Sequence, residues 1–366
     1  MRGKKHGQIS VACLLDVEQM IPPKHPIRAI KRILNVVLGE MDSHFEEMYA
    51  DAGRPSIPPE RLLLSKVLMA LYSIRSERQF CERLQYDLLF RWFLDLNPDE
   101  AIFDHSTFSQ NQARLLEHKV ADLFFAEVVW FAKAKHWISD QHFSVDATLI
   151  ESWASLKSFK KKEPEGKDPS GPGDGNGWSD FKGEKRCNDT HESTTDPEAK
   201  LVRKGEGREA RLCFAGHAAM ENRNGLCVLF EVKPAVGAPE SAVAITQIKE
   251  LQERGIPVAT VGADRGYCTQ EFVEGTRDHG VVPHPAHDSR RRTMGVHLHS
   301  VAHATSQRVR RRIEQIFGWG KTAGGFRKSR YRGVERTHAA GQYVVASWNL
   351  LRMARLSQGP PGYARA

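Results

Sequence analysis

The stretch His142-Phe-Ser-Val-Asp-Ala-Thr148 alternates apolar and polar residues, as does a strand with one buried face. It therefore predicts that Asp146 lies within a half-buried strand. A second run, Pro257-Val-Ala-Thr-Val-Gly-Ala-Asp264, predicts a buried strand that Asp264 ends. A third, Gln307-Arg-Val-Arg-Arg-Arg-Ile-Glu-Gln-Ile-Phe317, has the pattern of a basic amphipathic helix that carries Glu314. Carboxylates on a strand, at a strand end and on a late helix can converge on divalent metal ions.

The elements between these acids extend the fold prediction. Asn224-Gly225 separates two apolar runs, which is a strong hairpin signal. Ser241 is expected to cap a helix over 242–254, and 280–285 is a short edge-like segment limited by its prolines. The order is then strand, hairpin, helix, strand, helix, short strand and helix. This is the order of a ribonuclease-H-like fold, with a mixed five-stranded sheet and flanking helices.

The part of the chain before the first acid has helical patterns. Pro26 opens an amphipathic helix, Pro58 and Pro59 open a second, and Ser76 forms a predicted capping box for a third. Several short helices with tight connections suit a DNA-binding module, and a helical packing or dimerisation domain is the alternative.

These patterns divide the chain into segments. We predict a helical N-terminal domain over 1–138, the candidate for DNA recognition, and a catalytic domain over 139–355. A Gly-, Pro- and Lys-rich segment at about 156–192 is expected to be a flexible insertion, because it buries too little to offset its ordering entropy. Residues 356–366 are expected to form a disordered tail. The fold class is thus α+β or α/β, with two domains.

Composition limits the class of protein. The chain has 366 residues, ordinary apolar content and no apolar run near the roughly 20 residues that span a bilayer. Its six cysteines are scattered and show no Cys-x-x-Cys pair, which argues against a zinc site or a disulfide framework. We expect no membrane association and a cytoplasmic, nucleoid-associated bacterial protein.

The positive charge is concentrated. Residues 286–336 contain 13 Lys and Arg against three acidic residues, although the whole chain carries only +8. This excess surrounds Glu314, as expected where a polyanion approaches a group of carboxylates. A solvated basic face is the alternative interpretation.

The three acids and several flanking motifs resemble those of DDE transposases of bacterial insertion sequences, specifically the insertion-sequence-five family. That family places Tyr, Arg, Glu and Lys around its last acid. Arg310, Glu314 and Lys321 match the spacing, whereas Gln307 stands where the family has Tyr. Further family-like stretches are Arg54-Pro-Ser-Ile-Pro-Pro-Glu60, Phe90-Arg-Trp-Phe-Leu94, Asp104-His-Ser-Thr107, Gly216-His217 and Glu221-Asn222.

The resemblance implies a site and its cofactor. Asp146, Asp264 and Glu314 would be the catalytic residues and would hold two Mg²⁺ or Mn²⁺ ions, with Asp146 bridging both. Arg310 and Lys321 would contact DNA phosphate, although Gly318 and Gly320 are expected to end the helix before Lys321. Other expected DNA contacts are Arg308, Arg311, Arg265, Arg327 and Lys328. His217, Thr148, Tyr267 and Trp319 are expected to support the site from around it.

The resemblance also implies an activity and partners. Such an enzyme binds double-stranded DNA at terminal inverted repeats, cleaves at the element ends and transfers the 3′-hydroxyls to target DNA. Handling two ends implies a homodimer or higher oligomer on DNA. Two alternatives remain: a structure-selective ribonuclease-H-like nuclease, and a catalytically decayed DNA-binding repressor.

Overall fold

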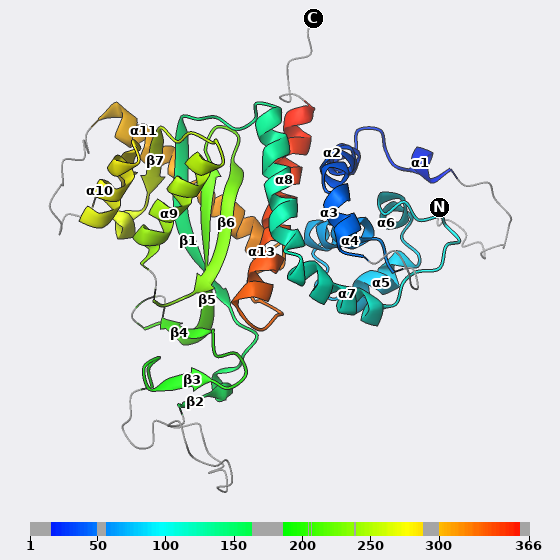
Figure 1. Ribbon diagram of the computed structural model, residues 1–366, viewed down its shortest axis with the longest axis horizontal. Helices are drawn as coiled ribbons and strands as arrows, with labels where there is room; N and C mark the ends of the chain where they lie inside the picture. Colours follow the sequence, from blue (N-terminus) through cyan, green and yellow to red (C-terminus); the bar gives the residue numbers. More distant parts are fainter. Residues whose placement is uncertain are drawn as a thin grey trace, which may run out of the picture.

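The computed structural model describes residues 16–49, 56–162, 186–203, 205, 207–237, 239–287 and 300–358. A mixed sheet lies at one side of the molecule, a group of helices lies at the other, and the long helix α13 (Val334–Ser357) runs between them (Figure 1). The predicted architecture, a helical N-terminal part followed by a mixed sheet with flanking helices, is confirmed. Within the described residues, no helix is both long and apolar enough to cross a bilayer.

The N-terminal part is helical, as its patterns predict. Pro26 and Pro59 each begin a helix, and the Ser76 hydroxyl accepts a hydrogen bond from the backbone N–H of Gln79 at 3.4 Å. The helices are α1 (Val17–Met20), α2 (Pro26–Glu40), α3 (Asp42–Glu47), α4 (Pro59–Leu71), α5 (Glu77–Leu84), α6 (Leu88–Phe93), α7 (His105–Glu117) and α8 (Val120–Ala134).

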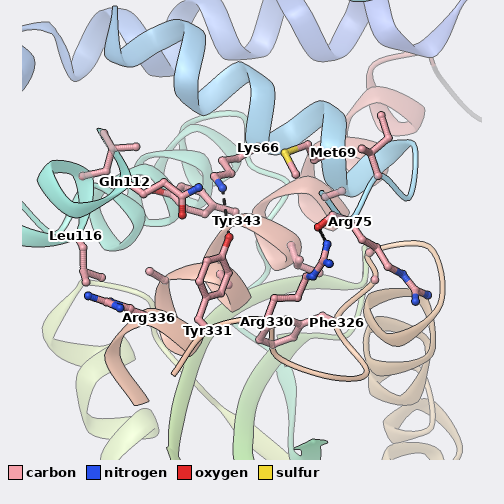
Figure 2. Close-up of a pocket in the computed structure, with 18 of the residues that line it drawn as sticks. Lys66, Met69, Arg75, Gln112, Leu116, Phe326, Arg330, Tyr331, Arg336 and Tyr343 are labelled. Atoms are coloured by element: carbon pink, nitrogen blue, oxygen red, sulfur yellow. Dashed lines mark hydrogen bonds between the residues drawn. The ribbon is translucent and has the colours of Figure 1, made fainter. Parts of the chain in front are cut away.

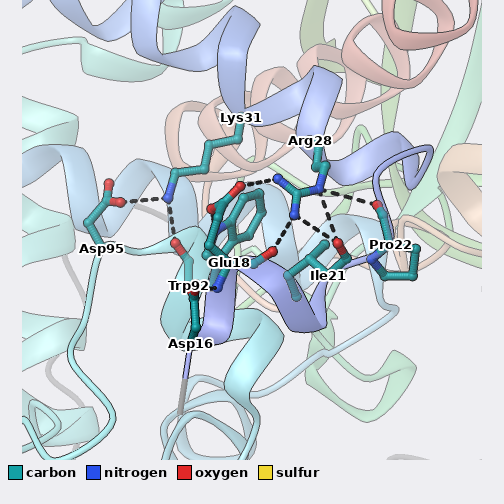
Figure 3. A network of polar contacts seen from close by, with 8 residues as sticks. All are labelled: Asp16, Glu18, Ile21, Pro22, Arg28, Lys31, Trp92 and Asp95. Atoms are coloured by element: carbon teal, nitrogen blue, oxygen red, sulfur yellow. Dashed lines mark hydrogen bonds and ion pairs between the residues drawn. The ribbon is translucent and has the colours of Figure 1, made fainter. Parts of the chain in front are cut away.

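A polar network fastens the short helix α1 to its neighbours (Figure 3). The Arg28 guanidinium binds Glu18 and also donates to the carbonyl of Ile21 at 2.7 Å. Lys31 donates to Asp95 at 2.5 Å and lies 4.4 Å from the centre of the Trp92 ring. These contacts join α1 to α2 and α6. A four-residue helix has too few internal hydrogen bonds to be stable alone, so α1 depends on them.

The main sheet has the order β4-β5-β1-β7-β8, and β6 also pairs with β5. Strands β5 and β6 run antiparallel to each other and β5 to β1, whereas β7 is parallel to β1 and β8. The bounds are β1 (His142–Glu151), β4 (Lys200–Arg203), β5 (Ala210–Glu221), β6 (Leu226–Pro234), β7 (Thr260–Ala263) and β8 (Val282–Pro285). The prediction of five strands was wrong by one: β4 is too short and too charged to show a strand pattern.

Helices cover the sheet on both faces. Helix α9 (Glu240–Glu253) packs on β1 and β5 and against α10 (Gln270–Asp278), in front of the sheet in Figure 1. The other face is covered by α13, which packs on β6, α8, α2 and α4, and by α12 (Ile313–Lys321). Helix α11 (Val301–Arg310) lies against β7 and β8.

The predicted insertion at about 156–192 begins and ends in regular structure. A 3₁₀ turn, η1 (Leu156–Ser158), leads into β2 (Phe159–Lys161), which pairs antiparallel with β3 (His191–Ser193). Its central residues, 163–185, lie outside the described part of the chain, as do 359–366 of the predicted tail. Residues up to Ser357 belong to α13.

Two glycines allow α13 to approach the sheet. A Cβ on Gly341 of α13 would lie 2.4 Å from the ring of Phe230, and one on Gly216 of β5 would lie 2.9 Å from Ile150. Phe230 therefore fills a slot that side chains at these two positions would occupy. The result is a close contact between helix α13 and the sheet.

Substituting Gly341 with Ala is expected to lower the free energy of unfolding by about 1–3 kcal/mol, because the added methyl overlaps the buried Phe230 ring. Urea denaturation would measure the change. Gly318→Ala is the matched control, since a Cβ there meets nothing within 4 Å and alanine favours a helix. Equal stability of the two variants would show that Phe230 moves aside without cost.

Candidate active site

Asp146 lies on β1, and Asp264 directly follows the neighbouring strand β7. The parallel ladder between β1 and β7 pairs Ser144 with Gly262 and ends there. Asp146 and Asp264 are each two residues beyond that pair, so they occupy equivalent positions at the point where the strands separate. Strand alternation places Asp146 and Thr148 on the same face of β1.

The carboxylates of Asp146, Asp264 and Glu240 affect one another electrostatically. The pKa of Asp146 is raised to about 6: burial is the largest cause, Asp264 and Glu240 contribute to the rise, and the backbone N–H of Ala147 and the guanidinium of Arg310 oppose it. Burial and Asp264 also raise the pKa of Glu240, at the start of α9. Negative charge is thus concentrated in a partly desolvated place, which is the environment that a divalent cation would relieve.

Asp264 is held by the turn that follows it. Its side chain accepts a hydrogen bond from the backbone N–H of Gly266 at 2.7 Å, at the start of η2 (Arg265–Tyr267). The Tyr267 ring is buried and packs against Phe272, and burial together with Glu240, Asp146 and Asp264 raises its pKa well above the ordinary value. Tyr267 therefore forms an uncharged wall beside the acids, and the neighbouring Arg265 is exposed.

The predicted helix over 307–317 is present but is split in two. Helix α11 ends at Arg310 and α12 begins at Ile313, with a turn at Arg311 and Arg312 between them. The Arg312 guanidinium donates to the carbonyl of Asn222 at 2.7 Å, and Ile313 is completely buried. The turn allows α12 to bury its apolar side on the sheet, a long-range requirement that the local pattern does not contain.

Gln307 and Arg310 are positioned at the end of α11. The Gln307 amide donates to the carbonyls of His284 and Ala263, so it binds the ends of β7 and β8. Its oxygen accepts a hydrogen bond from the Arg310 guanidinium at 3.3 Å. Gln307, which departs from the family pattern, thus holds the arginine that acts on Asp146.

Lys321 contacts the same strand as Asp146. Its ammonium donates to the Thr148 hydroxyl at 2.6 Å. The prediction that Gly318 and Gly320 end the helix before Lys321 was wrong, because α12 continues through Lys321. Glycine is tolerated here since Gly320 and Gly324 lie close to Val344 of α13, where packing stabilises the turn.

Glu314 lies two turns before Lys321 on α12 and is exposed. A spacing of seven residues puts both side chains on one face of the helix. However, Glu314 is not among the groups that act most strongly on Asp146. Among the described residues, no three His, Cys, Asp or Glu side chains are close enough together to hold a metal ion. The structure therefore brings Asp146 and Asp264 together, but not Glu314.

The other predicted residues do not all lie beside Asp146 and Asp264. His217 pairs with Ala147, so it lies on the opposite face of the sheet from Asp146. Trp319 packs against Trp348 of α13, with ring centres 5.9 Å apart. Arg308 and Arg311 are exposed on and after α11, and Arg327 and Lys328 are exposed beside Glu151 at the far end of β1.

Glu240 has no local sequence pattern that indicates a place near the two aspartates. It lies in the first turn of α9, where an acidic residue is an ordinary partner of the helix dipole and attracts no notice. The predicted cap, Ser241, is inside the helix and donates to Glu271 at 3.1 Å. Only the packing of α9 beside η2 reveals that Glu240 is near Asp264.

The mixed sheet brings Asp146 of β1 near Asp264, which follows β7, and two such carboxylates can hold a divalent metal ion. Two family models extend this conclusion: "Transposase domain (DUF772)" matches residues 15–114, and "Transposase DDE domain" matches residues 180–350. The protein is a DDE transposase, an enzyme that cuts and joins DNA strands. Enzymes of this family depend on divalent metal ions, and Asp146 with Asp264 supplies carboxylate oxygens of the kind that Mg²⁺ prefers.

Other comparisons give distant matches. A search of curated proteins finds no significant match to the sequence. Among solved structures, a piggyBac transposase synaptic complex with hairpin DNA matches with TM-score 0.42 and 9% identity, covering 92% of this chain and 76% of that chain. A Mos1 transposase paired-end complex with the left transposon end matches with TM-score 0.21 and 11% identity, covering 76% and 82%. The two family models, not these likenesses, carry the identification.

The raised pKa of Asp146 gives a prediction about stability. In metal-free protein at pH 7, Asp146→Asn is expected to raise the free energy of unfolding by roughly 1–2 kcal/mol, because it removes a partly buried charge that the fold disfavours. Folded protein binds the proton more readily than unfolded protein between about pH 4 and pH 6. The gain should therefore shrink as the pH falls through 6.

Thermal unfolding in a chelator would measure this gain at several pH values. Asp278→Asn, at an exposed carboxylate on α10, is the control and should change little. A destabilised Asp146→Asn protein would mean that the Asp146 carboxylate serves the fold rather than the reaction.

Proposed function

We propose that this enzyme is the transposase of a bacterial insertion sequence of the insertion-sequence-five type. It binds the terminal inverted repeats of its element, cleaves at the ends and transfers the 3′-hydroxyls to target DNA. The observation that carries this proposal is the position of Asp146 beside Asp264, in a chain whose residues 180–350 match a transposase DDE domain. Arg310, Glu314 and Lys321 add the spacing of the family's last motif.

The residues of the site divide the work. Asp146, Asp264 and Glu314 would hold two Mg²⁺ or Mn²⁺ ions, which activate the attacking oxygen and stabilise the leaving oxygen when bound. Arg310 lies close enough to act on Asp146, and Lys321 is held at Thr148. The side chains of Arg310 and Lys321 would both bind the phosphates on either side of the bond to be broken.

Exposed basic residues would guide the DNA toward these acids. Arg265 follows Asp264, Arg308 and Arg311 flank Arg310, and Arg327 with Lys328 follows Lys321 along the chain. We expect the helical part to recognise the ends and two protomers to hold two ends together. Both expectations rest on the family and on the basic charge around the acids.

A joining assay tests the function. A labelled duplex that carries the terminal repeats of the element is incubated with the protein, a second duplex and Mg²⁺. Cleavage at the repeat followed by joining is expected, and chelation should stop both. Cleavage without joining of a precut end would indicate a structure-selective nuclease instead, and specific binding without cleavage would indicate a decayed copy that acts as a repressor.

A further inference from the structure

A cavity of about 290 Å³ lies between the helical part and the C-terminal part of the chain (Figure 2). Helices α4 and α7 form one side of it, with Met69 and Leu116 among the lining residues. The segment 324–331 and the start of α13 form the other side, with Phe326 and Tyr343. Its size is near the lower end of small-ligand sites, roughly 300–1,000 Å³, so it suits a single small group rather than a duplex.

The rim of this cavity is basic. Arg75, Lys328, Arg330 and Arg336 line it, and all four are exposed. No Asp or Glu is among the lining residues, and Arg330 donates to the backbone carbonyl of Arg75, a neutral group that leaves the charge of the rim unchanged. Four like charges around one opening repel each other unless an anion or solvent screens them. The charge of the rim therefore favours a negatively charged ligand.

The wall of the cavity is polar at one point and aromatic around it. Buried Lys66 donates to Glu77 at 3.1 Å and to the Tyr331 hydroxyl at 3.3 Å, and Gln112 donates to Glu77 at 2.9 Å. Figure 2 shows Tyr331 pointing toward Lys66 from the opposite side. The network neutralises Lys66 and fixes the Tyr331 ring, so the wall is a rigid surface.

Aromatic side chains give that wall a flat surface on which a ring can stack. Phe326, Tyr331 and Tyr343 line the cavity together with aliphatic residues. A flat aromatic surface beside arginines suits a molecule that combines a phosphate with a planar ring, because rings stack on aromatic side chains and guanidinium groups bind phosphate. A plain inorganic anion would leave the aromatic wall without a partner.

We propose that this cavity binds one unpaired nucleotide, with its phosphate at the arginine rim and its base against the aromatic wall. In a DNA transposase the nucleotide can come from a DNA strand or from a free nucleotide. The strand is favoured by position: the segment that lines the cavity begins three residues after Lys321, which is bound to Thr148 beside Asp146. A strand leaving the acids along this segment would reach the cavity next.

Binding of a fluorescein-labelled single-stranded oligothymidylate to the full chain tests the proposal. The double variant Arg330→Ala/Arg336→Ala is expected to weaken binding at least about tenfold, since it removes two phosphate contacts. Ala113→Trp should weaken it by a similar factor, because it fills the mouth from the exposed side of α7 without changing the charge. The double variant Lys24→Ala/Lys135→Ala removes two exposed cations elsewhere and should stay within about twofold of the wild type.

The outcomes separate the pocket from general charge effects. Unchanged binding by Ala113→Trp, or an equal loss in the Lys24/Lys135 control, would overturn the proposal. Competition by thymidine 5′-monophosphate in wild type would show that a free nucleotide suffices, whereas its failure to compete would assign the site to a strand. The joining assay, run on the same proteins, is independent: pocket-dependent binding without joining would contradict the proposed function and leave the pocket standing.

Discussion

Asp264→Asn is expected to lower cleavage at the element end by roughly 10³-fold, which corresponds to about 4 kcal/mol of transition-state stabilisation. Asp264 lies at the strand end beside Asp146, where its carboxylate would be a metal ligand. Asparagine keeps the shape, and its side-chain oxygen can still accept from the Gly266 N–H that holds Asp264. The loss would therefore report on charge and metal binding rather than on the fold.

A gel-based cleavage assay and a binding assay on the same terminal-repeat duplex would measure this effect. Binding should stay within about twofold of wild type, because an acidic residue contributes no phosphate contact. Asp278→Asn, at an exposed carboxylate on α10, should cleave normally. Cleavage by Asp264→Asn at the wild-type rate would show that Asp264 has no role in the reaction. It would thereby contradict the proposed site formed by Asp146 and Asp264.

The second large effect concerns the third acid. Glu314→Gln is expected to lower cleavage by roughly 10²–10³-fold, whereas Glu240→Gln is expected to stay within several-fold of wild type. Glu314 has the family spacing to Arg310 and Lys321, and it shares a helix face with the lysine that binds Thr148. Glu240, unlike Glu314, is among the groups that raise the pKa of Asp146, and Asp264 raises the pKa of Glu240.

Comparing these two variants would decide which glutamate completes the site. Titration with Mn²⁺ provides a readout apart from activity: the variant that removes a ligand should bind the ion more weakly. Loss of cleavage and of Mn²⁺ affinity in Glu240→Gln, with Glu314→Gln unaffected, would transfer the role to α9. Normal behaviour of both would mean that two aspartates suffice.

Local chemistry made much of the fold predictable. Pro26 and Pro59 begin their helices, Ser76 caps α5, and the turn at Asn224-Gly225 joins β5 to β6, with Gly225 at φ +70°. Each of these signals acts over four residues or fewer, so it is legible in a single stretch. The alternation around Asp146 likewise predicts the strand β1.

Features that depend on distant partners were not predictable. The face on which His217 lies follows from its pairing with Ala147, and the break after Arg310 follows from the burial of Ile313. The nearness of Glu240 to Asp264 follows from the packing of α9 on η2. In each case a tertiary contact determines the result, and the local pattern is compatible with either outcome.

Helix α13 connects the helical part of the molecule to the sheet. One continuous apolar core includes Leu34 and Phe80 of the helical part, Met353 of α13 and Phe230 of the sheet. Because α13 packs on β6 and also on α2, α4 and α8, the two halves are expected to unfold as a single cooperative unit rather than move as separate bodies. If the helical part binds a DNA end, that end would then be held at a fixed distance and orientation relative to Asp146 and Asp264.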